Sequence, residues 1–390
     1  MSLVLKHPPP LALYIHIPWC VRKCPYCDFN SHVTEQIPEA AYIDALLADV
    51  QLELPLVWGR RIHSVFIGGG TPSLFSPHAI EHLLTQLRAL LPISPHAEIT
   101  LEANPGSVEA ARFADFRAAG INRLSIGVQS FNDKHLHALG RIHDANAAIR
   151  AIETALRADF ASVNIDLMYA LPEQTLAEAL ADVHTAIALQ PGQISYYQLT
   201  LEPNTAFFHT PPPLPDDDNA WDIQLAGRAA LAAAGYIGYE TSAFARAGHQ
   251  CRHNINYWEF GDYLGIGAGA HGKLTFVNDA RIERRWKMRS PRDYMQHAGT
   301  PASLAGQHDL TPAELPFEFM MNALRLTEGV PIDYFATRTG VAYSSLEQRI
   351  QTLVDEDWVA LDHASRRFAP TQKGRDFLND LLIKFLPDNA

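Results

Sequence analysis

The chain of 390 residues is long enough to bury one large core and a smaller second one, and its 47% hydrophobic and 19% charged residues are typical of a globular enzyme rather than a disordered protein. Its formal net charge of −12 argues against a surface that neutralises nucleic-acid phosphates, so we expect no nucleic acid as a partner. It contains no uninterrupted apolar stretch of about 18 residues, and its few cysteines indicate a reducing compartment, so we expect a cytoplasmic protein.

Short runs rich in β-branched and aromatic residues alternate with longer helical patterns from residue 11 to about residue 239. The expected strands are 12–17, 64–67, 98–101, 124–128, 163–168 and 194–199. Helical periodicity between them, as at 40–54 and 78–90, predicts helices on the outside. This alternation is typical of βα units around a parallel sheet, and six units predict an α/β fold, a partial (βα)6 barrel.

A cysteine motif directly follows the first expected strand, where the sequence reads IPWCVRKCPYCDFN. Cys20, Cys24 and Cys27 have the spacing CxxxCxxC, which lets three thiolates reach three corners of an iron-sulfur cubane. The fourth iron then has no protein ligand and stays open to another molecule. A structural zinc site is an alternative, but zinc normally takes four protein ligands, and only His16 and His32 are close enough in sequence to complete one.

Three glycines end the second expected strand, in the sequence GGGTP from Gly68. Without side chains, their backbone groups can approach a ligand closely, although a tight turn alone would also explain them. Polar residues also follow later strands, among them Glu102, Gln129 and Asp166. Because the active sites of barrel enzymes lie at the carboxyl ends of the strands, we expect these side chains at one site.

The rest of the chain differs from the repeated units. We expect a partial-barrel domain at 1–245, a connecting segment at 246–300 with the motifs HNINYW and GIGAGAHG, and a C-terminal domain at 301–390. In the last section, helices precede 358–370, which reads as a two-stranded wing before a final helix. This pattern predicts a small α+β winged-helix-like domain. Its excess of acidic over basic residues argues against DNA binding.

The cysteine motif, with an aromatic residue before its last cysteine, and the GGGTP segment together resemble the radical S-adenosylmethionine (SAM) superfamily. This resemblance implies a 4Fe-4S cluster on Cys20, Cys24 and Cys27, with SAM bound to the open iron.

Further segments, including YIHIPWC, LEANP, GVQSF, LGRIHD and NIDLMYALP, resemble the oxygen-independent coproporphyrinogen III oxidase family. The cofactor-binding residues that this resemblance implies are Tyr14, Tyr26, Gly70, Thr71, Pro72, Glu102, Gln129, Arg141 and Asp166. Taken alone, Arg141 would be read as a surface residue.

Within that family, the oxidases carry CxxxCxxCxC, whereas Phe29 stands here at the position of the extra cysteine. This difference makes decarboxylase activity doubtful and leaves the question of enzyme activity open. The motif HNxxYW, here His253 to Trp258, is instead similar to the HemW group of heme chaperones. That likeness implies that the chain binds heme and transfers it, with His253 as the heme ligand and Cys251 or His271 as alternatives.

The implied partners are therefore heme and heme-acceptor proteins such as respiratory hemoproteins, with a homodimer and transient contact with membrane-bound acceptors left open. Oxidative decarboxylation of coproporphyrinogen III is the alternative function, and radical chemistry on an unrelated substrate is a third. Because the HNxxYW motif lies well downstream of the expected barrel strands, heme binding is expected to be independent of the cluster.

Overall fold

The computed structural model describes residues 3–34, 36–362 and 364–386. The outer limits expected for the first and last domains, Met1 and Ala390, lie outside these residues. All six expected strands form and run parallel, in the order β1, β4, β5, β6, β7 and β8. They span Leu11–Ile17, Ile62–Gly69, Ile93–Ala103, Arg123–Gln129, Ser162–Tyr169 and Gln193–Gln198. The α/β fold with a partial barrel is therefore confirmed.

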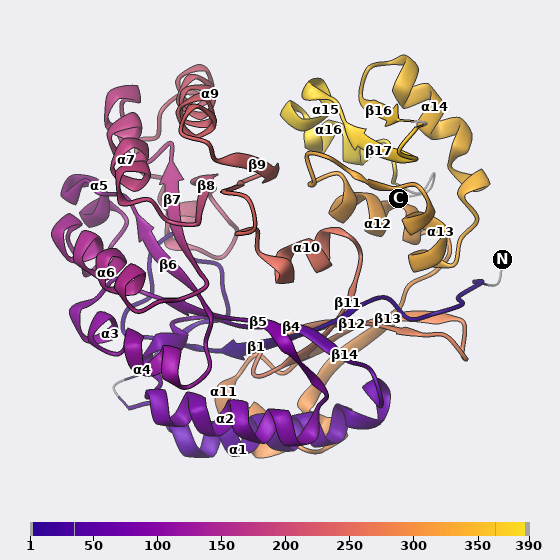
Figure 1. Cartoon of the computed structure of the whole chain (residues 1–390), viewed down its shortest axis with the longest axis horizontal. Helices are drawn as coiled ribbons and strands as arrows, with labels where there is room; N and C mark the ends of the chain where they lie inside the picture. Colours follow the sequence, from indigo (N-terminus) through magenta and orange to yellow (C-terminus); the bar gives the residue numbers. More distant parts are fainter. Residues whose placement is uncertain (1–2, 35, 363, 387–390) are drawn as a thin grey trace.

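Helices cover the outer face of these strands (Figure 1). They are α1 (Glu39–Glu53), α2 (Pro77–Leu90), α3 (Ser107–Ala111), α4 (Phe113–Ala118), α5 (Asp133–Ala138), α6 (Ala145–Arg157), α7 (Leu176–Leu189) and α9 (Asp217–Ala233). The short helix α8 (Ala206–His209) lies instead against the cysteine loop, where the backbone N–H of Phe207 donates to the carbonyl of Pro25. Helix α6 illustrates why these segments form helices and which face they bury. The Asp144 carboxylate caps its first turn by accepting from the backbone of Ala147, and Ala148, Ala151 and Ile152 recur on the face that packs into the core.

The main sheet continues on both sides of the six strands. Beyond β8 lie β10 (Ala243–Ala245) and β9 (Ile237–Glu240), both antiparallel to their neighbours. Beyond β1 lie β11 (Asp262–Ile266), parallel to β1, and then the antiparallel strands β12 (His271–Phe276), β13 (Arg281–Lys287) and β14 (Leu304–Asp309). The segment expected as a connection, 246–300, therefore contributes β11, β12 and β13 to the sheet.

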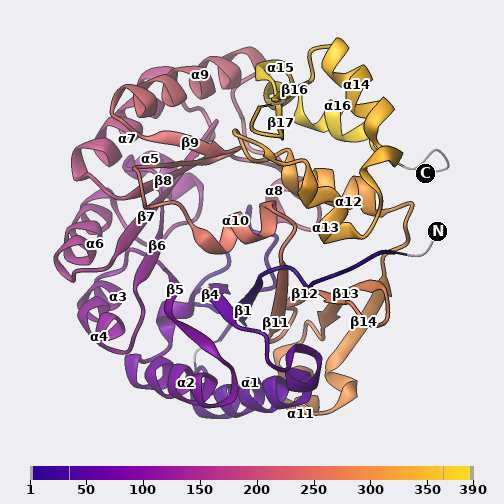
Figure 2. The ribbon, with the colours of Figure 1, turned by 45° about the vertical axis from the view of Figure 1, so that its right-hand side comes forward.

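Two further helices lie in that segment, α10 (Arg252–Trp258) and α11 (Pro291–His297). Figure 2 shows α10 between the strands of the barrel and the C-terminal elements. The short strands β2 (Trp19–Cys20) and β3 (His32–Val33) pair with each other at the two ends of the cysteine loop.

The C-terminal elements pack around a second hydrophobic cluster, which includes Phe319, Phe335 and Phe368 and also takes in Leu3, Phe260 and Ile282. They are α12 (Leu315–Ala323), β15 (Val330–Pro331), α13 (Asp333–Thr339), α14 (Glu347–Asp355), β16 (Val359–Asp362), β17 (Arg367–Pro370), α15 (Gln372–Asp376) and α16 (Leu378–Ile383). Strands β16 and β17 are antiparallel, as expected of the wing. The Arg284–Glu318 ion pair joins this domain to the sheet. Within the described ranges, no helix combines the length and the apolar composition needed to span a membrane.

Candidate functional site

The cysteine loop leaves β1 and is held at both ends by hydrogen bonds. The backbone N–H of His32 donates to the carbonyl of Pro18 at 2.7 Å, which closes the base of the loop. The side-chain amide of Asn30 donates to the carbonyls of Ala268 and Arg289, at 2.9 and 2.8 Å. The loop is therefore tied to the far strands of the sheet, β11 to β13, as well as to its own strand.

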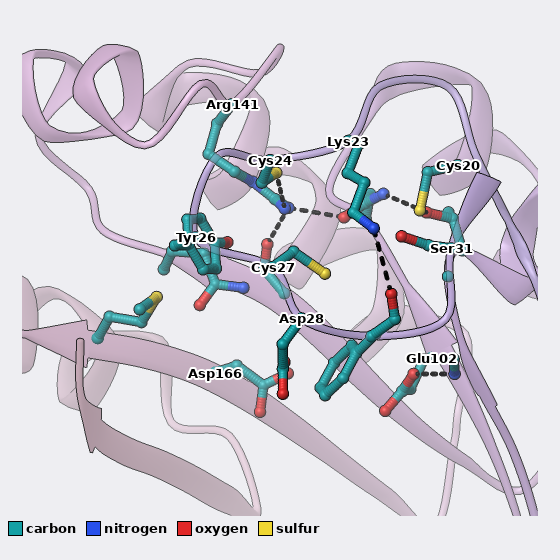
Figure 3. A pocket seen from close by; sticks show the side chains of 18 of the residues that line it. Cys20, Lys23, Cys24, Tyr26, Cys27, Asp28, Ser31, Glu102, Arg141 and Asp166 are labelled. Atoms are coloured by element: carbon teal, nitrogen blue, oxygen red, sulfur yellow. Dashed lines mark hydrogen bonds between the residues drawn. The ribbon is translucent and has the colours of Figure 1, made fainter. Parts of the chain in front are cut away.

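Cys20, Cys24 and Cys27 line one cavity of about 320 Å³ at the carboxyl ends of the strands, referred to below as the cluster cavity (Figure 3). All three are free thiols and partly exposed. Burial raises the pKa of Cys20 and of Cys27. No three His, Cys, Asp or Glu side chains of the described residues converge as they would around a single metal ion. Thiols spread around a common cavity suit a cubane, in which each thiolate binds a different iron.

The three glycines of the second strand pack against the cysteine loop. A Cβ on Gly70 would lie 2.4 Å from the carbonyl oxygen of Trp19, and one on Gly69 would lie 2.6 Å from the His16 ring. The backbone N–H of Gly70 donates to the carbonyl of Ile17, and that of Thr71 to the carbonyl of Trp19. Gly69, Gly70 and Thr71 also line the cluster cavity. The glycines therefore let the loop approach the strand as well as exposing backbone to the cavity.

Two half-buried carboxyl groups face the cluster cavity, Glu102 from β5 and Asp166 from β7, with β6 between these two strands. Burial and the nearby Asp166 raise the pKa of Glu102 to about 8, and a hydrogen bond from the backbone of Gly69 opposes this shift. Burial likewise raises the pKa of Asp166, which accepts a hydrogen bond from Asn164 at 2.7 Å. Such groups gain a full negative charge most readily when a cation binds beside them.

Arg141 is half-buried and lines the cluster cavity from the loop after α5. Its guanidinium donates to Asn104 Oδ1 and to the carbonyl of Gly127, both at 2.6 Å, and lies 3.7 Å from the sulfur of Cys24. Its Nε has no partner within the described structure. A half-buried cation with an unused donor beside a thiol fits a site for an anionic cluster and a carboxylate-bearing ligand.

Gln129 reaches the cluster cavity because β6 ends in an irregularity. The register of β6 against β7 shifts between Gly127 and Gln129, and Gln129 has a φ of 73°. Its side-chain oxygen accepts a hydrogen bond from the hydroxyl of Tyr197 at 2.7 Å. Strained backbone of this kind is found at sites where a side chain must be aimed.

Of the residues predicted from the sequence, ten line the cluster cavity together: Cys20, Cys24, Tyr26, Cys27, Gly70, Thr71, Glu102, Gln129, Arg141 and Asp166. Pro72 is buried at the start of a short 3-10 helix and is not among the lining residues. Tyr14 lies elsewhere, with its hydroxyl 2.9 Å from His16 Nδ1. Asn104, Ser125 and Tyr197 also line the cavity but were not predicted as site residues, although each lies in or just beyond a barrel strand.

His253 is only 1% exposed, inside the barrel. Its Nδ1 is 3.0 Å from the hydroxyl of Ser64 and its Nε2 is 2.7 Å from the hydroxyl of Tyr257. Both ring nitrogens are thus occupied, and burial together with Arg123 lowers the pKa of His253 to about 3. Cys251 is equally enclosed, and burial raises the pKa of its thiol to about 12. In this conformation neither side chain offers a free atom to a ligand.

Comparison with known proteins agrees with the geometry. Residues 14–186 match the family described as the radical SAM superfamily, and residues 310–377 match the HemN C-terminal domain. The chain is 50% identical to the "Heme chaperone HemW" of Escherichia coli K12 over 97% of its own length and 99% of that protein. It is 49% identical to the protein of the same name from Haemophilus influenzae, again over 97% and 99%.

A less similar relative and a solved structure also match this chain. The mitochondrial "Radical S-adenosyl methionine domain-containing protein 1" of Bos taurus is 42% identical over 70% of this chain and 64% of its own length. The solved structure titled "Coproporphyrinogen III oxidase (HemN) from Escherichia coli is a Radical SAM enzyme" superposes with a TM-score of 0.81 at 24% identity, covering 98% of this chain and 91% of that one. At that identity the likeness concerns the fold alone.

Proposed function

From the premise that the chain belongs to the HemW family of heme chaperones, within the radical SAM superfamily, we propose that it binds heme and transfers it to heme-acceptor proteins. A 4Fe-4S cluster on Cys20, Cys24 and Cys27 and a bound SAM molecule complete the scaffold. The observation that carries the proposal is 50% identity, over nearly the full length, to a protein named as a heme chaperone, together with ten predicted residues that line the cluster cavity.

The residues of the cluster cavity fit these two cofactors. When bound, the cluster supplies an electron for cleavage of the sulfonium bond, and the protein supplies the orientation. Glu102 and Asp166 offer negative charge to the sulfonium and amino groups, and Arg141 offers a donor to the carboxylate. Backbone groups of Gly69 and Gly70 line the side nearest to Cys20.

Position 29, which distinguishes the oxidases from the heme chaperones, also supports the chaperone function. Phe29 stands where the oxidases carry a further cysteine. It lies in the cysteine loop and is 57% exposed. A phenyl ring cannot ligate iron or donate a hydrogen atom as a thiol can, so Phe29 favours binding over decarboxylation. We propose that the protein works in the reducing cytoplasm, with respiratory hemoproteins as acceptors. We also propose that it forms a homodimer and makes transient contact with membrane-bound acceptors.

Two assays on one anaerobically reconstituted preparation test this function. Hemin should bind stoichiometrically, as followed by its Soret band, and should move to an added apo-hemoprotein. Coproporphyrinogen III supplied with SAM and a reductant should remain intact. Decarboxylated product formed over many turnovers would make the protein an oxidase, and failure to take up heme would refute the chaperone function.

A further inference from the structure

A second cavity, of about 480 Å³, adjoins the cluster cavity, and the two share the walls formed by Asp28, Phe29, Gly69 and Glu102. This volume lies within the range of sites for small molecules. Its other walls come from β1, from β11 and the segments that follow it, and from α10. A ligand in it would therefore lie directly beside the cysteine loop.

The walls of the second cavity suit a flat, largely apolar ligand that carries carboxylates. Phe29, Tyr257 and Tyr263 contribute aromatic rings. Arg289 is exposed at the cavity and forms no salt bridge within the described part of the chain. Aromatic faces can stack on a porphyrin, and an uncommitted guanidinium can pair with a propionate.

His271 is the histidine of this cavity that is free to bind a metal. It begins β12, is exposed, and stacks on Trp286 with ring centroids 6.2 Å apart. No hydrogen bond occupies either of its ring nitrogens within residues 3–34, 36–362 and 364–386. The other histidine at the cavity, His16, uses both nitrogens, at 2.9 Å from the Tyr14 hydroxyl and 2.8 Å from the Asn30 carbonyl. Coordination to iron requires a free imidazole lone pair.

His253 reaches the second cavity only through its neighbour. Its Nε2 is 2.7 Å from the hydroxyl of Tyr257, and the Tyr257 ring lines the cavity one helical turn further along α10. On its other side, Ser64 holds the ring at 3.0 Å. Ser64 therefore holds the His253 ring, and His253 in turn holds the Tyr257 ring at the wall of the second cavity.

We propose that heme binds in the second cavity with its iron ligated by His271, and that His253 is a positioning residue that holds Tyr257 against the porphyrin. This assignment rests on the proposed function, since it locates the heme that this function requires. It also places the heme beside the cysteine loop, rather than at a distant site that is independent of the cluster.

The axial ligand can be read spectroscopically in the full-length, cluster-reconstituted protein. Hemin is titrated in, the ligand is identified by magnetic circular dichroism and electron paramagnetic resonance, and heme loss to excess apomyoglobin is timed. His271→Ala should lose the imidazole signature and release heme at least about tenfold faster. His271→Met should replace that signature with one of sulfur ligation. His82→Ala, at an exposed histidine on α2, is the matched control and should behave as wild type.

His253→Gln separates positioning from ligation, because the amide can keep a hydrogen bond to Ser64. It should release heme faster yet retain the imidazole signature, with iron and sulfide contents at the wild-type level as the check on folding. An unchanged signature in His271→Ala, or its loss in His253→Gln, would overturn the assignment while leaving the chaperone function standing. Wild-type protein that takes up no heme would overturn the function itself.

Discussion

Glu102 is a carboxyl group whose charge depends on what lies beside it. It is half-buried, it shares the cluster cavity with Asp166, and its pKa is raised to about 8. At neutral pH in the ligand-free protein, the group is therefore mostly protonated. A cationic ligand beside it favours the carboxylate, and binding then expels the proton.

We predict that SAM binding below pH 8 releases up to about one proton from Glu102, and that this release fades as the pH rises past the raised pKa. Affinity should accordingly increase with pH up to that point. Calorimetry in buffers of different ionisation enthalpy counts the protons, and Glu102→Gln should remove this part of the count. The same proton count in wild type and Glu102→Gln would show that Glu102 does not ionise on binding.

The four cysteines have different surroundings, and we predict that they behave differently. Cys20, Cys24 and Cys27 share the cluster cavity, whereas Cys251 does not line it, is 0% exposed and lies near Glu98. Changing any one of the first three to alanine should strip most of the iron and sulfide from anaerobically purified protein. Cys251→Ala, the matched control, should keep both. Stoichiometric zinc with little iron in the wild-type protein would contradict the cluster.

Among the elements, the cysteine loop and the end of β4 depend on each other. Gly70 faces the carbonyl of Trp19 at a distance that leaves no room for a methyl group, while two backbone hydrogen bonds join the segments. The loop can therefore present its thiols only if the strand end stays free of side chains. Overpacking at such a contact typically costs about 1–3 kcal/mol.

We predict that Gly70→Ala lowers the iron content and destabilises the fold, because the loop must move away from β4. Gly248→Ala serves as the control: an added Cβ there meets open space, and its φ of 83° makes it costly for stability alone. Thermal unfolding together with iron analysis separates the two effects. Full iron loading of Gly70→Ala would show that the contact does not position the loop.

At the scale of the whole molecule, Asn30 connects parts of the chain that are far apart in sequence. Its amide holds the carbonyls of Ala268 and Arg289, which flank His271 and the second cavity. A cluster that orders the cysteine loop should thereby also order the edge of the second cavity. If heme binds in the second cavity as proposed, we expect this contact to couple it to the cluster.

We predict that wild-type protein retains heme longer with its cluster than without it, and that Asn30→Ala abolishes this difference because the two hydrogen bonds are lost. Lys23→Ala removes a different hydrogen bond of the same loop, to the carbonyl of Phe29, and should keep the dependence. Heme transfer to apomyoglobin, timed before and after anaerobic reconstitution, is the measurement. A cluster dependence that persists in Asn30→Ala would place the coupling elsewhere.

The sequence by itself determined the parallel βα units and the cysteine motif, because both depend on local spacing. Apolar periodicity specifies which face of a strand or helix is buried, and CxxxCxxC brings three thiols together within one loop. Strand-end residues such as Glu102, Gln129 and Asp166 were also predictable, since parallel strands bring their carboxyl ends to the same edge of a sheet.

Only the tertiary structure decided how the segment after residue 245 is used. Strand β11 pairs with β1, which lies about 250 residues earlier in the chain, and no local pattern encodes such a pairing. That pairing brings His271 and Tyr257 to the cysteine loop and buries His253 behind them. The motif alone made His253 the expected ligand, but which imidazole keeps a free nitrogen depends on neighbours such as Ser64, and these are defined only once the chain has folded.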